Sequence, residues 1–104
     1  MEENNELDLV SMNIIANSGD ARSLAFRALA AAKAGNFDEA EDLLKQSDES
    51  TTLAHKAQTE LLFQEANGEK HQVNVLLIHS QDHLMTSILA TELIKEMILL
   101  YKNR

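Results

Sequence analysis

The absence of proline constrains the fold of this 104-residue chain more than any other feature of its sequence. Proline interrupts helices, and glycine, the next strongest helix breaker, occurs only three times. Gly35 and Gly68 each stand beside an asparagine, in a context suited to the end of one helix and the start of another. The sequence therefore predicts an all-α protein, an antiparallel three-helix bundle with short connections.

The predicted helix bounds follow from these two glycines. The first helix is expected over about Asp8–Ala34, the second reaches about Ala66, and the third covers Val75–Lys102. Asn36 is a suitable N-cap for the second helix, because Glu39 stands three residues later and can complete a capping box.

The first two helices carry lines of residues at alternating three- and four-residue steps, which is the spacing of a bundle. Gly19 interrupts the first line, and we expect it to mark a bend or the close approach of another helix. The line along the second helix is more polar, so part of it is expected to face a wet groove. Its residues are Ala40, Leu44, Ser47, Thr51, Ala54, Gln58 and Leu61.

The third segment is the hardest to assign, because the β-branched residues between Val73 and Ile78 also suit a strand. Its length without a helix breaker favours a helix, and a lone strand would have no partner. The apolar residues of this helix cover more of its circumference than one core stripe requires, which predicts self-association. These residues are Leu84, Met85, Ile88, Leu89, Leu93, Ile94, Met97, Ile98 and Tyr101.

Charge and composition exclude several classes of function. Nine basic against seventeen acidic residues give a net charge of −8, which disfavours nucleic acid and anionic lipid as partners. The chain has no cysteine, and its acidic start lacks the regions of a signal peptide, so a cytoplasmic protein without direct membrane insertion is expected. Residues 1–8 are expected to form a disordered acidic tail before a single domain over residues 9–104.

His79, Asp82 and His83 form the strongest candidate site, because their i, i+3, i+4 spacing puts them on one side of a helix. The same line continues through Leu89 and Leu93, so ionisable groups share it with residues expected to be buried. Three interpretations compete. A neutral imidazole can accept a phosphoryl group, two histidines and a carboxylate can bind a metal, or the cluster can be purely structural.

Other chemistries receive little support from the residues. The chain has no phosphate-binding glycine pattern, no nucleophile elbow and no HExxH motif. His55 and His71 are expected to be structural. The main alternative to a catalytic role is a non-catalytic helical interaction module with structural histidines, and a metal-dependent hydrolase is a more distant one.

The chain nevertheless resembles a known family, the lactose/cellobiose-type enzyme IIA of the bacterial phosphoenolpyruvate-dependent sugar phosphotransferase system. The resemblance covers nearly the whole chain after the tail, and its most specific segment begins at His79. Ser80 is a mild departure, since a smaller residue commonly follows this histidine. The segments that carry the resemblance are residues 17–23 (NSGDARS), His55 with Gln58 and Thr59, and residues 79–86 (HSQDHLMT).

The resemblance implies a homotrimer in which His79 of each subunit carries a phosphoryl group. This group would come from HPr and pass to a cysteine of the cognate enzyme IIB during disaccharide uptake. Asp82 matches a carboxylate that meets its copies on the trimer axis, where a divalent metal, expected to be Mg²⁺, can bind. Gln81 and His83 flank the histidine and are expected to donate hydrogen bonds to a phosphoryl oxygen. No arginine stands near His79 in the sequence, so no strong arginine clamp is expected.

Overall fold

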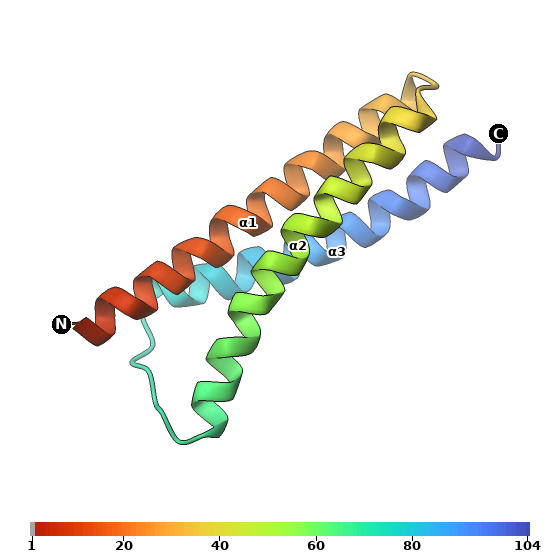
Figure 1. Ribbon diagram of the computed structural model, residues 1–104. Helices are drawn as coiled ribbons and strands as arrows, with labels where there is room; N and C mark the ends of the chain where they lie inside the picture. Colours follow the sequence, from red (N-terminus) through yellow and green to blue (C-terminus); the bar gives the residue numbers. More distant parts are fainter. Residues whose placement is uncertain (1) are drawn as a thin grey trace.

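The computed structural model describes residues 2–104, with side chains from Glu6 onward. The described residues form three helices, α1 (Glu2–Lys33), α2 (Phe37–Ala66) and α3 (Val75–Lys102) (Figure 1). The all-α prediction is confirmed. The bounds of α2 and α3 are those expected, and the strand-like residues from Val75 to Ile78 form the first turn of α3.

The N-terminal segment differs from the expectation for residues 1–8. Met1 lies outside the described residues, but α1 begins at Glu2 rather than near Asp8. Leu7 is buried in an apolar cluster with residues of α2 and α3, and Asn74 donates a hydrogen bond of 3.3 Å to the Asp8 carboxylate. These contacts explain why the helix extends towards the N-terminus, since Leu7 has apolar partners that local sequence does not reveal.

The helices lie in an up-down-up order (Figure 1). α1 packs along both α2 and α3, whereas α2 and α3 contact each other little. The resulting molecule is long and narrow, with extents of 53 × 21 × 19 Å. The bundle is therefore open on one side, and α3 has only one neighbour along most of its length.

Both connections contain a glycine in the left-handed backbone region, as their second residue. Gly35 has φ of +85° and Gly68 has φ of +92°, values that residues with a side chain rarely adopt. The amides that follow them close the helix ends: Asn36 N–H donates to the Ala31 carbonyl at 2.8 Å and Glu69 N–H to Gln64 at 2.9 Å. At each of these two helix ends the hydrogen bond belongs to a Schellman motif, which satisfies the last carbonyls of α1 and α2.

The starts of the helices were less well predicted. The Asn36 side chain makes no capping hydrogen bond within the described chain, so the predicted capping box with Glu39 does not form. Asn74 is instead the residue that caps α3, where its side-chain oxygen accepts a hydrogen bond of 2.8 Å from the Leu77 amide. An N-cap oxygen of this kind satisfies an amide that has no partner in the first turn.

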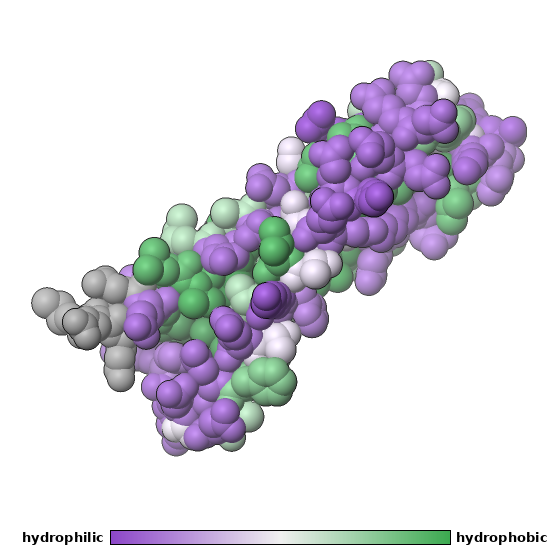
Figure 2. Space-filling model, viewed as in Figure 1, coloured by the Kyte–Doolittle hydropathy of each residue, from purple (hydrophilic) through white to green (hydrophobic). Residues whose placement is uncertain are grey.

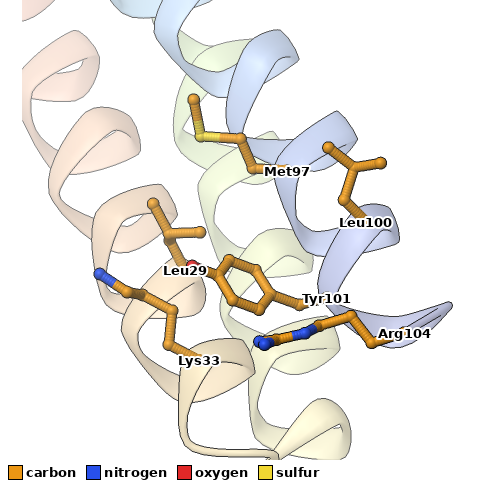
Figure 3. Close-up of a pocket in the computed structure, with 6 residues that line it drawn as sticks. All are labelled: Leu29, Lys33, Met97, Leu100, Tyr101 and Arg104. Atoms are coloured by element: carbon orange, nitrogen blue, oxygen red, sulfur yellow. The ribbon is translucent and has the colours of Figure 1, made fainter.

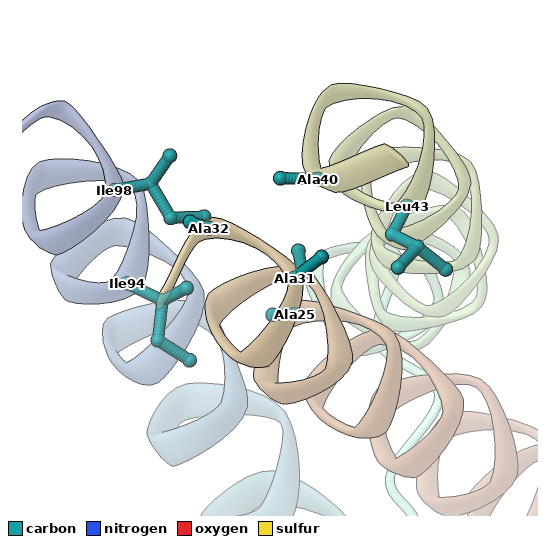
Figure 4. Packing of buried hydrophobic residues seen from close by; sticks show 8 residues of the cluster. Ala25, Ala31, Ala32, Ala40, Leu43, Ile94 and Ile98 are labelled. Carbon is teal, nitrogen blue, oxygen red and sulfur yellow. The ribbon is translucent and has the colours of Figure 1, made fainter. Parts of the chain in front are cut away.

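In the described residues, hydrophobic clusters occupy the two ends of the bundle. At the end near the first connection, alanines of α1 lie between isoleucines of α3 and residues of α2 (Figure 4). At the other end, larger side chains such as Ile14 and Leu84 pack together. Small side chains let the helices approach closely in between, and the Ser47 hydroxyl donates to the Ala21 carbonyl at 2.7 Å. The buried residues of this middle region include Ser18, Ser47, Ser87 and Thr91.

The predicted lines of buried residues were correct only in part. On α2, Leu43 rather than Leu44 faces the core, and Gln58 lines a groove of about 200 Å³ with Leu61 and Gln81. Polar residues cover much of the face over the first half of α2, and apolar surface gathers near the N-terminal half of α1 (Figure 2). Leu9 of α1 is exposed.

Candidate functional site

His79 lies in the second turn of α3, with its side chain exposed. Its ring stacks on the ring of His83, one turn later, with 5.6 Å between the centroids and 26° between the planes. The i, i+4 spacing therefore brings the two predicted histidines together. Because His83 is partly buried while His79 is exposed, only His79 presents its ring freely to a macromolecular partner.

His83 is held from α1 as well as from its own helix. A guanidinium nitrogen of Arg22 lies 3.5 Å from Nδ1 of His83. A Cβ atom added at Gly19 would lie 3.3 Å from Nε2 of the same ring. The predicted close approach at Gly19 is thus confirmed, and the approaching group is an imidazole. Burial, followed by the positive charges of Arg22 and His79, lowers the pKa of His83, while Asp82 opposes the shift.

Gln81 faces α2 rather than His79. Its amide exchanges a reciprocal pair of hydrogen bonds with Gln58, and it also donates to the Ser80 hydroxyl at 3.3 Å. Ser80 is buried and donates to the Leu77 carbonyl at 2.6 Å, so the departure at this position fits without an unpaired hydroxyl. Both donors of the Gln81 amide are engaged, and one must be released before Gln81 can bind a phosphoryl oxygen.

Asp82 corrects one expectation from the sequence. The predicted line through His79, Asp82, Leu89 and Leu93 is exposed in the single chain, because α3 packs on α1 through its opposite face. That buried face consists of Ser80, Leu84, Ser87, Thr91, Ile94 and Ile98. Within the described residues of one chain, no three His, Asp or Glu side chains gather in a way that could hold a metal.

The Arg22 contact does not follow from the spacing of residues along one helix, because Arg22 and His83 are 61 residues apart. The interruption at Gly19 was its only local signal. The remaining histidines lie elsewhere: His55 is exposed near the Thr59 hydroxyl, and Nε2 of His71 lies 2.8 Å from the Gln64 side-chain oxygen. Neither belongs to the cluster of His79 and His83.

A groove of about 530 Å³ lies at the other end of α3, between α1 and the last turns of the helix. Its side chains come from α1 and from α3 with the residues that follow it, and the Tyr101 ring points towards Leu29 (Figure 3), with the Arg104 guanidinium 5.4 Å from the ring centroid. None of its lining residues belongs to the histidine cluster. They are Leu29, Lys33, Met97, Leu100, Tyr101 and Arg104.

The cluster around His79 suits reversible covalent chemistry better than hydrolysis. An exposed imidazole can accept and release a group, and neighbouring neutral donors can orient it without binding it too tightly. The chain matches a family model over residues 9–102, described as the lactose/cellobiose-specific IIA subunit of the PTS system.

The chain belongs to this family.

Relatives and solved structures of the family are similar over almost the whole IIA chain. The lactose-specific EIIA component of Streptococcus mutans is 50% identical over 98 residues, which cover 94% of each chain. The cellobiose-specific enzyme IIA of Bacillus anthracis is 46% identical with a TM-score of 0.91, covering 93% of this chain and 89% of that one. IIA(Chitobiose) of Escherichia coli, solved in complex with HPr, is 46% identical with a TM-score of 0.81, covering 93% and 94%.

As a IIA component, this protein is a carrier subunit of the phosphotransferase system. Family membership favours the phosphoryl-accepting interpretation of the histidine cluster over a helical interaction module or a metal-dependent hydrolase. None of the helices within residues 2–104 combines the length and the hydrophobicity that a membrane span requires.

Proposed function

We propose that this protein accepts a phosphoryl group on His79 from HPr and passes it to a cysteine of its cognate enzyme IIB. The observation that carries this proposal is the exposed His79 ring, stacked on a partly buried His83 in a chain of the IIA family. The similar IIA(Chitobiose) of Escherichia coli was solved in complex with HPr, which supports HPr as the donor.

The transfer requires an unprotonated nitrogen on His79. This nitrogen attacks phosphorus in line, so that the N–P bond to HPr breaks as the N–P bond to His79 forms. The other ring nitrogen of His79 keeps its proton. In the second transfer the N–P bond to His79 breaks as an S–P bond forms on the thiolate of enzyme IIB. His83 and Gln81 supply hydrogen bonds to the phosphoryl oxygens, Gln81 after releasing one of its present partners.

Exposure of His79 fits a carrier that must meet two different proteins in turn. A carrier also needs moderate stabilisation of the transferred group, because a phosphoryl group held too strongly would not leave. Arg22 contacts His83 rather than His79, so the His83 ring separates its positive charge from the phosphoryl group on His79.

The active assembly is a homotrimer formed through the exposed face of α3. Apolar residues of this face, including Met85, Leu89 and Leu100, have no cover in the single chain, and burying them requires another copy. The number three follows from the family resemblance. A parallel arrangement of three α3 helices around an axis brings the three Asp82 carboxylates together.

These carboxylates fit a divalent metal, with Mg²⁺ as the expected ion. One Asp82 from each subunit provides hard oxygen ligands, and water completes the octahedral coordination that Mg²⁺ prefers. The bound ion would neutralise three like charges that otherwise repel one another at the axis. Its contribution is to assembly, and no step of the transfer depends on it.

The transported sugar is a disaccharide, and the site of action is the cytoplasm. The relatives are named for lactose, cellobiose and N,N'-diacetylchitobiose, which share this size. Nothing in the environment of His79 selects among sugars, because the carrier passes on a phosphoryl group and does not bind the sugar.

The test is phosphoryl acceptance from phosphoenolpyruvate through enzyme I and HPr, followed by intact-mass measurement under alkaline conditions that preserve phosphohistidine. The wild-type protein is expected to gain one phosphoryl group per chain. His79→Gln should keep its helical content and gain none, whereas His55→Gln and His71→Gln serve as matched controls that should gain one. Uptake by His79→Gln at a rate near wild type would reject the assignment.

A further inference from the structure

Both nitrogens of the His83 ring face α1, and this arrangement assigns a role to that helix. A guanidinium nitrogen of Arg22 lies 3.5 Å from Nδ1. Gly19 faces Nε2, and a Cβ atom added at Gly19 would lie 3.3 Å from that nitrogen. Gly19 and Arg22 are three residues apart, so they occupy the same side of α1. α1 therefore sets the orientation of an imidazole that belongs to α3.

The Arg22 contact also fixes which nitrogen carries the proton. A guanidinium only donates hydrogen bonds and does not lose its charge in proteins. Nδ1 of His83 must then be the acceptor, so the neutral ring carries its hydrogen on Nε2. Because Gly19 has no side chain, nothing at this position of α1 covers that edge of the ring, whereas a Cβ atom there would lie 3.3 Å from Nε2.

We propose that Arg22 is a positioning residue for phosphoryl transfer: it fixes His83 as the Nε2–H tautomer, and Gly19 keeps this N–H edge open for the phosphoryl group on His79. The inference rests on the proposed function of His79. Arg22 acts through His83 and does not touch the phosphoryl group. Because His83 stacks on His79 at 5.6 Å, the fixed ring also restricts the orientation of His79 on one side.

The first measurement is made on the unphosphorylated protein, at a pH where the histidine rings are neutral. Nitrogen-15 NMR of the His83 ring should show the Nε2–H tautomer in the wild type. Arg22→Leu removes the donor and should give a mixture of both tautomers. Arg22→Lys can still donate and cannot accept, so it should restore the Nε2–H tautomer.

The second measurement is the rate of phosphoryl acceptance from phosphorylated HPr for the same proteins. Arg22→Leu should accept the phosphoryl group about tenfold more slowly, because the His83 ring, which donates the hydrogen bond to this group, is no longer held in one orientation. Arg22→Lys should recover most of the rate. Arg27→Leu, which removes an exposed arginine from the same helix, is the matched control and should behave as the wild type.

Gly19→Ala provides a second variant that does not alter Arg22. Its added methyl group should displace the His83 ring and slow phosphoryl acceptance, although alanine favours the helix and should not lower the melting temperature. A slower rate with unchanged or raised thermal stability separates positioning from a loss of folding.

The outcomes distinguish this inference from the proposed function. If wild-type His79 accepts no phosphoryl group, the proposed function fails, while the tautomer measurement still tests the Arg22 contact. If the wild type is phosphorylated and Arg22→Leu retains either the Nε2–H tautomer or the wild-type rate, the positioning role of Arg22 is overturned.

Discussion

The two faces of α3 differ in a way that a single chain does not explain. Half of the buried side chains on the face that packs on α1 are serines or threonines, and the others are Leu84 and two isoleucines. The opposite face carries larger apolar side chains, and Leu89 is 56% exposed while Leu84 is 2% exposed. Large apolar side chains of this helix thus lie on the surface of the subunit. One face of α3 packs within the subunit, and an exposed apolar surface such as the other face is typical of a site of protein–protein contact.

The hydrophobic cluster around the alanines of α1 also shows that little apolar area is buried within the subunit. Around the alanines of α1, close helix approach limits the apolar area that can be buried. A chain that buries little apolar area within one subunit has reason to bury more between subunits, since small domains have limited cores. Three predictions test this difference between the inner and outer faces of α3.

Leu93→Lys should have the largest effect on the outer face. A lysine at this exposed position would bring three positive charges into the proposed interface, and the energetic cost of burying unpaired charges is several kcal/mol. The trimer should dissociate at micromolar concentration, as measured by light scattering. Leu53→Lys, at a similarly exposed position on α2, should leave the assembly intact.

Leu84→Ala should have the largest effect on the inner face. Removing this buried side chain should lower the free energy of unfolding by about 2–5 kcal/mol, because it leaves a cavity between α3 and α1. Denaturation at two protein concentrations separates the two faces: the loss for Leu84→Ala should be the same at both. A loss that appears only on dilution would assign Leu84 to the subunit interface instead.

Asp82→Leu should have a smaller effect of opposite sign. Replacing three converging carboxylates by apolar side chains should stabilise the trimer by roughly 1–4 kcal/mol and remove its dependence on Mg²⁺. A chelator should lower the melting temperature of the wild type, because the carboxylates then repel one another. Thermal melts of both proteins with Mg²⁺ and with a chelator provide the test. A strongly destabilised Asp82→Leu protein would place this carboxylate away from a shared axis.

The sequence was sufficient for the helices because their signals are local. The absence of proline and the positions of Gly35 and Gly68 determined three helices, and both glycines adopt the positive φ that ends a helix. The spacing of His79 and His83 was sufficient to bring their rings together. These features depend on residues within one or two turns of each other.

The remainder depends on contacts between distant residues. Arg22 reaches His83 across 61 residues, and Leu7 extends α1 because its apolar partners lie on the other two helices. The sequence showed that α3 has two apolar faces, but it placed the line through Asp82 and Leu89 inside the protein. Which face packs on α1 is decided by close approach of small side chains such as Ser80 and Ser87, which hydrophobicity alone does not predict.

The most direct test of the whole account is native mass spectrometry of the protein after phosphorylation by HPr, at micromolar concentration and alkaline pH. We expect an assembly of three chains that carries three phosphoryl groups, and we expect peptide mapping to assign each group to His79. A phosphorylated monomer would contradict the role of the outer face of α3, and a phosphoryl group on any other residue would contradict the role of His79.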